Sequence, residues 1–239
     1  MGRSAASYVE STDSKQKSRE LVLQFLLKNH KASAMKFFSL PSTNWTFENM
    51  LVSEFPGTLH LVGVEQNPSF FTRAMCLIPG REKGIENERV VEKPLMEVVY
   101  TSRASIFYCE LGRFIHEAPA LSNISKNVKR CLDWTAVWLD ICGTVDILKN
   151  ILPEMGNCLS DKVTRIPLAI TFATGRDKLS NFEGIDASDT FEKRCLFIKK
   201  CLSQMSGWEI EGDMDTYKYP CASGSSNMMG LSMMVLKKV

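Results

Sequence analysis

The sequence predicts an α/β fold in which a mostly parallel, seven-stranded sheet has helices on both faces and ends in an antiparallel hairpin. Three observations support this fold class. Short apolar runs alternate with segments of helical period through most of the 239 residues. Runs such as 166–173 are apolar along their whole length, which is typical of parallel strands that are buried on both faces. After the last helical segment, two extended segments flank a turn at 223–226, which predicts the hairpin.

The composition is that of an ordinary globular domain. Hydrophobic residues make up 44% of the chain and charged residues 23%, and the formal net charge of +2 does not indicate a partner. We expect a polar, mobile tail over residues 1–17 and a single domain over residues 18–239. The N-terminal residues are polar and no apolar run approaches the length of a membrane helix, so we expect an intracellular, cytoplasmic protein without a membrane segment.

The cysteines and histidines do not form a metal-binding pattern. The chain has 8 cysteines and 3 histidines. No two cysteines are separated by two residues, and Cys195 and Cys201 have no histidine nearby. Zinc sites need such closely spaced ligands, so the sequence predicts no metal centre and reduced, buried cysteines.

In the first half of the chain, apolar spacing and turn residues define the elements. Val22, Phe25 and Leu26 recur at helical spacing, and the pair Pro56 and Gly57 ends a second helix. The elements expected here are a helix over 18–29, a strand over 35–40, a helix between 45 and 55, a strand over 59–64 and a helix from Pro68 or Ser69.

In the second half, the charged segment 81–93 has no apolar period and predicts a loop or surface insertion. The run 106–109 fits a strand or a helix equally well. The other expected elements are strands over 96–101, 136–140 and 166–173, helices over 122–132, 145–155 and 190–205, a polar loop over 179–189, and the hairpin strands over 208–219 and 228–236.

The segment 135–144 is where we expect a functional site. Its apolar run ends on the single carboxylate Asp140, small residues follow, and a helical segment begins at Val145. Open α/β sheets bind their ligands beyond the carboxyl ends of the strands, so an acid at this point is a candidate site residue. The alternative is that Asp140 only caps the helix that follows.

The alternation of strands and helices, the terminal hairpin and the acids at two strand ends together resemble the class I S-adenosylmethionine-dependent methyltransferases. The resemblance covers roughly residues 18–239. It implies a three-layer, Rossmann-like sandwich, S-adenosylmethionine as cofactor, and methyl transfer as the activity. It also implies that Glu65, at the end of the second strand, holds the ribose hydroxyls of the cofactor. Asp140, at the end of the fourth strand, would then face the methyl acceptor as the catalytic residue.

The loop after the first strand lies where the family binds the methionine end of the cofactor. The resemblance therefore assigns cofactor contacts to Pro41, Ser42, Thr43 and Asn44, and the cofactor ammonium to Glu48 in the following helix. The family usually has a glycine-rich run in this loop, which lets backbone approach the ligand, whereas this chain has no glycine there. Amides at the start of the next helix are the remaining backbone donors for a carboxylate.

Basic residues suggest an anionic acceptor such as RNA or DNA. Arg176 and Lys178 follow the fifth apolar strand and are candidate substrate-binding residues. Three further basic residues are expected near the rim of the site: Lys126, Lys129 and Arg130. The segment after Asp140 lacks the paired prolines of DNA amino-methylating enzymes, which argues against an adenine or cytosine amino methylase.

Two other functions remain open at this point. The glycine-free loop is compatible with a catalytically inactive binding or regulatory protein of the same fold. A nicotinamide-dependent enzyme is disfavoured, because the chain has no G-x-G-x-x-G motif and because a terminal hairpin is unexpected in that class.

Overall fold

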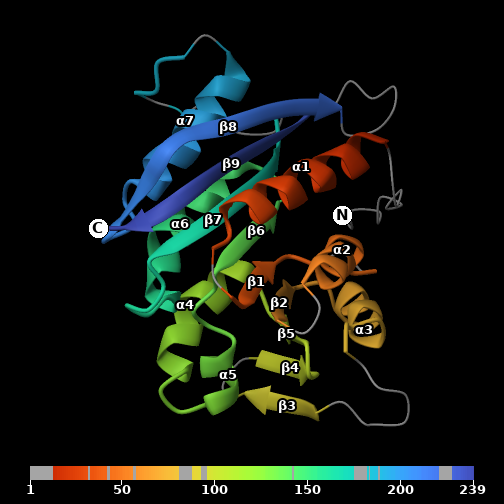
Figure 1. Cartoon of the computed structure of the whole chain (residues 1–239). Coiled ribbons are helices and arrows are strands. Elements are labelled where there is room, and N and C mark those ends of the chain that lie inside the picture. The colour runs from red at the N-terminus through yellow and green to blue at the C-terminus, as the bar shows by residue number, and fades with distance from the viewer. Residues whose placement is uncertain are drawn as a thin grey trace, which may run out of the picture.

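A single sheet runs through the computed structural model, and the helices pack on its two faces (Figure 1). The structure describes residues 13–31, 33–41, 44–55, 58–80, 88–92, 96–141, 143–174, 182, 184–187, 189–220 and 228–239. Within these residues the strands are β1 (Met35–Ser39), β2 (Leu59–Glu65), β3 (Glu88–Glu92), β4 (Met96–Tyr100), β5 (Ala104–Tyr108), β6 (Ala136–Asp140), β7 (Arg165–Ala173), β8 (Trp208–Pro220) and β9 (Met228–Lys238).

The strand order confirms the predicted fold class. Across the sheet the strands follow the order β3-β4-β5-β2-β1-β6-β7-β9-β8. The five strands from β5 to β7 are parallel to their neighbours, while β9 lies between β7 and β8 and is antiparallel to both. The C-terminal hairpin is therefore present as expected, with its last strand inserted next to the parallel part of the sheet.

One edge of the sheet differs from the prediction, because the described sheet has nine strands instead of seven. The additional pair is the antiparallel hairpin β3–β4, which extends the sheet beyond β5. The segment 81–93, expected to be a loop, thus contains the edge strand β3, and the expected strand 96–101 forms β4, which is antiparallel to both of its neighbours and is not the third parallel strand. That place belongs to β5, which includes residues 106–108 of the ambiguous run. Charged residues are common in strands at a sheet edge, so the charge content of 81–93 was misleading.

The helices form the two outer layers of a three-layer sandwich. One face carries α1 (Asp13–Asn29), α2 (Thr46–Glu54) and α3 (Pro68–Cys76), and the other carries α4 (Leu111–Leu121), α5 (Lys126–Arg130), α6 (Leu148–Met155) and α7 (Thr190–Leu202). Neighbouring residues of a strand enter opposite cores: Phe37 packs on the side of α1 to α3, and Phe38 packs on the side of α4 to α7. Short 3₁₀ turns at Val145–Ile147 and Gly156–Cys158 flank α6.

Helix α4 was not expected from the sequence, which predicted a helix over 122–132 instead. The structure ends α4 at Leu121 and gives only the short helix α5 in the predicted range. Pro119 lies inside α4 and has no N–H to donate to the carbonyl of Ile115. The thiol of Cys158 donates to that carbonyl instead, at 3.6 Å. A tertiary contact thus makes the proline tolerable, which the local sequence does not reveal.

Three helices start at the capping residues that their sequences provide. Asn67 accepts hydrogen bonds from the backbone N–H groups of Ser69 and Phe70 at the start of α3. Asp189 does the same at the start of α7, and Ser125 caps α5. None of the described helices combines the length and the apolar character needed to cross a membrane.

Candidate functional site

A cavity of about 490 Å³ opens at the carboxyl ends of the parallel strands. This volume lies within the range of about 300–1,000 Å³ that is common for small-molecule sites. The walls come from the ends of β1, β2, β5 and β6 and from the first half of α1. The chain passes from β1 to β2 on one side and later to β6 on the other, so the cavity lies at a point where the strand order reverses.

Glu65 enters the cavity as the last residue of β2. Its Oε1 accepts a hydrogen bond of 2.7 Å from the backbone N–H of Asn67, the residue that caps α3. The side chain is half-buried, and this burial raises the pKa of its carboxyl group, although the backbone N–H groups of Asn67 and Gln66 act in the opposite direction. The turn into α3 therefore fixes one carboxylate oxygen in place at the cavity wall.

Asp140 enters the same cavity as the last residue of β6. It is paired with Thr171 of β7 in the sheet, and its side chain is half-buried. Burial raises the pKa of this carboxyl group, while the positive charges of Lys15 and Arg19 lower it. A carboxylate with a raised pKa is a better proton acceptor than an exposed one, so Asp140 is suited to general-base chemistry.

Glu48 lies behind the cavity wall and not in it. Its side chain is 3% exposed, and its Oε1 accepts a hydrogen bond of 2.8 Å from the hydroxyl of Ser39. A small void of about 20 Å³ is lined by Glu48 together with Asp140 and Arg19. Burial raises the pKa of Glu48, its hydrogen bonds lower it, and the nearby charge of Asp140 raises it further. The predicted contact of Glu48 with a cofactor stays a prediction, and the structure places this carboxyl group next to Asp140.

The loop after β1 is shaped by bulky side chains. Pro41 and Asn44 line the cavity, whereas Ser42 and Thr43 are outside the described residues. The glycine that makes room for this loop is in the neighbouring strand β2: a Cβ atom at Gly63 would lie 2.7 Å from Cγ of Pro41 and 3.2 Å from the indole of Trp45. Trp45 has a left-handed φ of 52° and donates its indole N–H to the carbonyl of Ala74, so its ring packs in the core.

The structure adds three charged residues to the cavity that the sequence did not single out: Lys15, Arg19 and Glu110. Helix α1 begins at Asp13 instead of residue 18, so Lys15 is helical and one turn from Arg19. Arg19 is three residues before Val22, so both lie on the buried side of the helix. A cation within an apolar stripe is the sequence signal that could have identified Arg19 as a site residue. Glu110 follows β5, the strand that the sequence left ambiguous.

Arg19 has an unusual environment for a cation. Its side chain is 6% exposed, and its Nη1 atom has no hydrogen-bond partner among the residues that the structure describes. Buried charged groups are normally paired, and Arg19 is a cavity residue, so its unpartnered N–H indicates that an acceptor group belongs beside this side chain.

The structure describes three of the five basic residues predicted near the rim of the site. Arg176 and Lys178 are outside the described residues. Lys126, Lys129 and Arg130 belong to α5, and their predicted place near the rim is wrong. Helix α5 directly precedes β6, and the adjoining Leu132 accepts a hydrogen bond from Lys36 near the start of β1. These basic residues therefore lie toward the amino ends of the strands, opposite the cavity.

Two other chemistries find little support in the described part of the chain. Cys109 lines the cavity, but burial raises the pKa of its thiol to about 12, so the thiol stays protonated near neutral pH and is a poor nucleophile. Among the described residues, no three His, Cys, Asp or Glu side chains are grouped so that they could hold a metal ion.

Comparison with solved structures identifies the fold. Searches with family models and among curated proteins find no match. TYW2 from M. jannaschii, solved in complex with AdoMet, has a TM-score of 0.52 at 10% identity, covering 98% of this chain and 80% of its own. A putative sarcosine dimethylglycine methyltransferase from Galdieria sulphuraria has a TM-score of 0.52 at 12% identity, covering 95% and 87%. TrmN from Thermus thermophilus has a TM-score of 0.51 at 10% identity. The likeness covers 92% of this chain and 49% of the TrmN chain.

The chain thus has the Rossmann-like fold of the class I S-adenosylmethionine-dependent methyltransferases, as the strand order and these likenesses agree. At 10–12% identity the likeness concerns the fold, and the activity has to be argued from the cavity itself.

Proposed function

We propose that the protein binds S-adenosylmethionine in the cavity at the carboxyl ends of the strands and transfers its methyl group to an acceptor. The observation that carries the proposal is the position of two carboxyl groups. Glu65 and Asp140 reach one cavity from the ends of β2 and β6, on either side of β1. TYW2, which has this fold, was solved with AdoMet, and its likeness covers nearly the whole chain.

The donor and acceptor groups around the cavity suit such a cofactor. A carboxylate accepts two hydrogen bonds at once, so Glu65 at the cavity wall is suited to a ribose diol. Arg19, a cavity residue whose guanidinium has an unpartnered N–H, is suited to an anionic group. These are the two recognition elements that a nucleoside joined to an amino acid requires.

The chain's own residues would then act mainly by alignment. The bound cofactor supplies an activated methyl group on a sulfonium, so the protein has to hold the acceptor in line with it. Asp140 is placed to orient the acceptor or to take its proton. Apolar wall residues exclude water around this point: Leu40, Val64 and Ile141.

RNA or DNA is the acceptor class that we propose to test first. Arg176 and Lys178 follow β7 in the sequence. That strand ends next to the site, because the N–H of Ala173 donates to the carbonyl of Gly143, a cavity residue, at 3.0 Å. Cations close to this point would suit a phosphate backbone.

The experiment is a transfer assay with S-adenosylmethionine labelled in its methyl group, offered to total RNA, DNA and protein acceptors. Wild-type protein is expected to label one acceptor class, and Asp140→Ala to lose at least about 100-fold in rate, as removal of a general base does. Circular dichroism checks that the variant is folded. The matched control Asp213→Asn, an exposed carboxylate on β8, should keep wild-type activity. Wild-type rates in Asp140→Ala would defeat the assignment of Asp140.

The packing of the loop favours a second candidate function, a catalytically inactive binding or regulatory protein. Pro41 and Trp45 fill the space over Gly63, where the family usually brings glycine backbone to the cofactor. If this second function is correct, the folded protein should bind neither S-adenosylmethionine nor S-adenosylhomocysteine, its demethylated product, at millimolar concentration.

A further inference from the structure

We propose that helix α1 takes over the anion-binding role of the missing glycine-rich loop, with Arg19 binding the carboxylate at the amino-acid end of the cofactor. The inference rests on the proposed function, and it names the residue of this chain that replaces the loop. It also explains why a chain without loop glycines keeps the cavity.

The Arg19 side chain is buried without a full set of hydrogen-bond partners among the described residues. It is 6% exposed and lines the cavity, and its Nη1 is unpartnered among the described residues. A planar guanidinium offers paired N–H groups that match a carboxylate in a two-point contact. A ligand carboxylate in the cavity would complete the hydrogen bonding of Arg19 and offset the cost of burying its charge. Lys15, one turn earlier on α1, adds a second positive charge at the same wall.

The loop after β1 begins with a residue that cannot bind an anion through its backbone. Its first residue, Pro41, has no backbone N–H and therefore cannot donate to an anion. Pro41 is buried against Gly63 and is kept there by close packing. A side-chain cation from another element is a direct substitute for the backbone donors of a glycine-rich loop, and α1 is the element that reaches the cavity with one.

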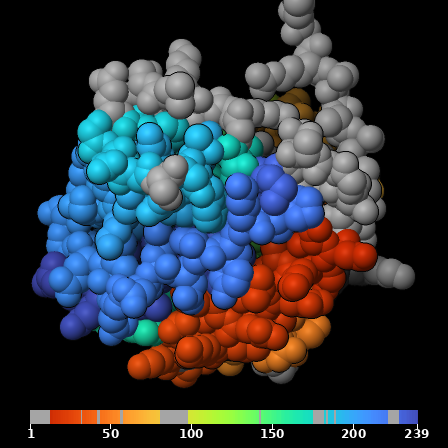
Figure 2. Space-filling view, turned by 90° about the horizontal axis from the view of Figure 1, so that it is seen from above, coloured from red at the N-terminus to blue at the C-terminus, as the bar shows by residue number. Residues whose placement is uncertain are grey.

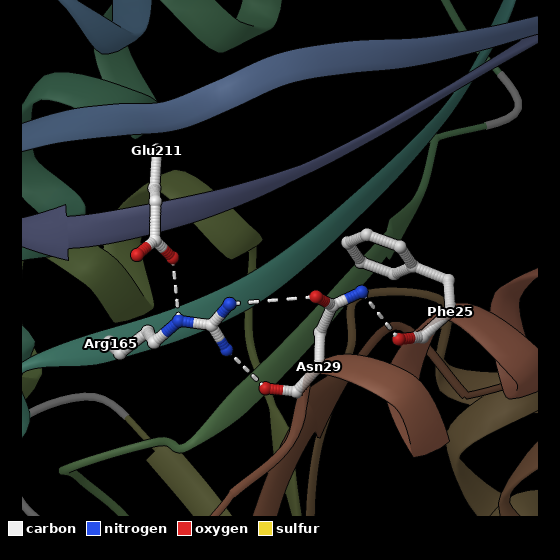
Figure 3. A network of polar contacts seen from close by, with 4 residues as sticks. All are labelled: Phe25, Asn29, Arg165 and Glu211. Carbon is white, nitrogen blue, oxygen red and sulfur yellow. Dashed lines mark hydrogen bonds and ion pairs between the residues drawn. The ribbon is translucent and has the colours of Figure 1, made fainter.

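Helix α1 is held against the sheet by a network of polar contacts at its C-terminal end. Helix α1 lies beside the C-terminal hairpin on one side of the molecule (Figure 2). Arg165 of β7 donates to the backbone carbonyl of Asn29 and, at 3.5 Å, to its side-chain oxygen. The same guanidinium bonds Glu211 of β8 at 2.6 Å, and Asn29 donates to the carbonyl of Phe25 at 2.9 Å (Figure 3).

This network fixes the C-terminal end of α1 to two strands of the sheet. Arg19 is ten residues before Asn29, which is a distance of about 15 Å along a helix. The anchor therefore sets how far the N-terminal half of α1 reaches over the ends of the strands. Arg165 is a positioning residue in this scheme, since it acts on the cavity only through α1.

The test compares two probes that differ in the amino-acid end. S-adenosylhomocysteine has the carboxylate, whereas 5′-methylthioadenosine keeps the nucleoside and the sulfur but lacks the carboxylate and the ammonium. Both are titrated by calorimetry into wild-type protein and Arg19→Met. We expect Arg19→Met to bind S-adenosylhomocysteine on the order of 10- to 100-fold more weakly and 5′-methylthioadenosine as wild type does.

Two further variants complete the design. Lys17→Met removes an exposed positive charge from the same helix and should change neither affinity. Arg19→Lys keeps the charge but loses the paired N–H groups. It should therefore weaken the binding of S-adenosylhomocysteine, by less than Arg19→Met does, and leave the binding of 5′-methylthioadenosine unchanged. It serves as the test variant if Arg19→Met does not fold.

The outcomes separate this inference from the proposed function. Wild type could bind both probes while Arg19→Met weakens the binding of both equally or changes the binding of neither. In either case the cavity is a cofactor site, but Arg19 does not bind the carboxylate. If wild type binds neither probe, the proposed function fails and the inference fails with it.

Discussion

Asp140 and Glu48 form a pair of carboxyl groups at the centre of the site, one at the cavity wall and one behind it. Both line the same small void, and burial raises the pKa of each. The Ser39 hydroxyl donates to Glu48, and Arg19 and Lys15 place positive charge near Asp140. Like charges disfavour each other's ionised form, so a Glu48 that tends to be protonated helps Asp140 to stay ionised.

The raised pKa of Glu48 predicts a pH-dependent cost to folding. Between the ordinary pKa of 4.5 and the higher folded value, the folded state holds a proton that the unfolded state has lost. The free energy of unfolding therefore falls as pH rises through this window. Glu48→Gln keeps an acceptor for Ser39 and has no charge to bury, so it should be more stable than wild type at pH 8, with a smaller advantage at pH 5.

Urea unfolding at the two pH values measures this difference. The exposed residue Glu209 of β8 provides the control, and Glu209→Gln should show the wild-type dependence on pH. An equal effect of Glu48→Gln at pH 5 and pH 8 would contradict the assignment of a raised pKa to Glu48.

At the scale of elements, α1 connects the sheet to the cavity, and its anchor can be tested without any ligand. Arg165→Met removes the hydrogen bonds to Asn29 and the ion pair with Glu211. Hydrogen bonds to charged groups contribute about 1.5–3 kcal/mol, so the amides of the last turns of α1 should exchange at least about tenfold faster, while those of β1 and β6 keep their protection.

Hydrogen exchange followed by mass spectrometry reads this effect segment by segment. Lys162→Met, an exposed cation shortly before β7, is the matched control and should leave the exchange of α1 unchanged. Uniformly faster exchange in all elements would mean that Arg165 supports the whole fold and does not anchor α1 in particular.

Elements were predictable where a local signal agreed with the tertiary structure. The acids Glu65 and Asp140 could be located because each ends an apolar run, and the carboxyl ends of parallel strands meet at one edge. Helix α4 could not be predicted, because Pro119 is tolerated through a contact with the distant Cys158. Strand β3 was missed because an edge strand accommodates charge that a central strand does not.

The remaining site residues depend on the path of the chain. Lys15 and Arg19 reach the cavity only because α1 starts at Asp13 and because its first half extends over the cavity. Sequence spacing puts Arg19 on the buried side of α1, but it does not say which part of the sheet that side covers. Conversely, the charges of α5 are visible in the sequence, while their place at the amino ends of the strands follows from the crossover before β6.

At the scale of the whole molecule, the cavity joins elements that are far apart in the sequence. Its walls come from α1, from the ends of β1, β2, β5 and β6, and from the segment after β6, so a ligand there contacts residues between Lys15 and Ile147. The edge hairpins β3–β4 and β8–β9 extend the sheet on either side without contributing residues to the described cavity wall. The sandwich holds the strand ends in register, and the carboxyl edge of the sheet carries the proposed chemistry.

The most direct measurement is a calorimetric titration of the folded protein with S-adenosylmethionine, for wild type, Glu65→Ala and the exposed control Glu54→Ala on α2. We expect micromolar binding by wild type and by Glu54→Ala. Glu65→Ala should bind on the order of 10- to 100-fold more weakly, because a charged acceptor for the ribose hydroxyls is lost. Absence of binding by folded wild type up to millimolar concentration, or equal binding by wild type and Glu65→Ala, would contradict this expectation.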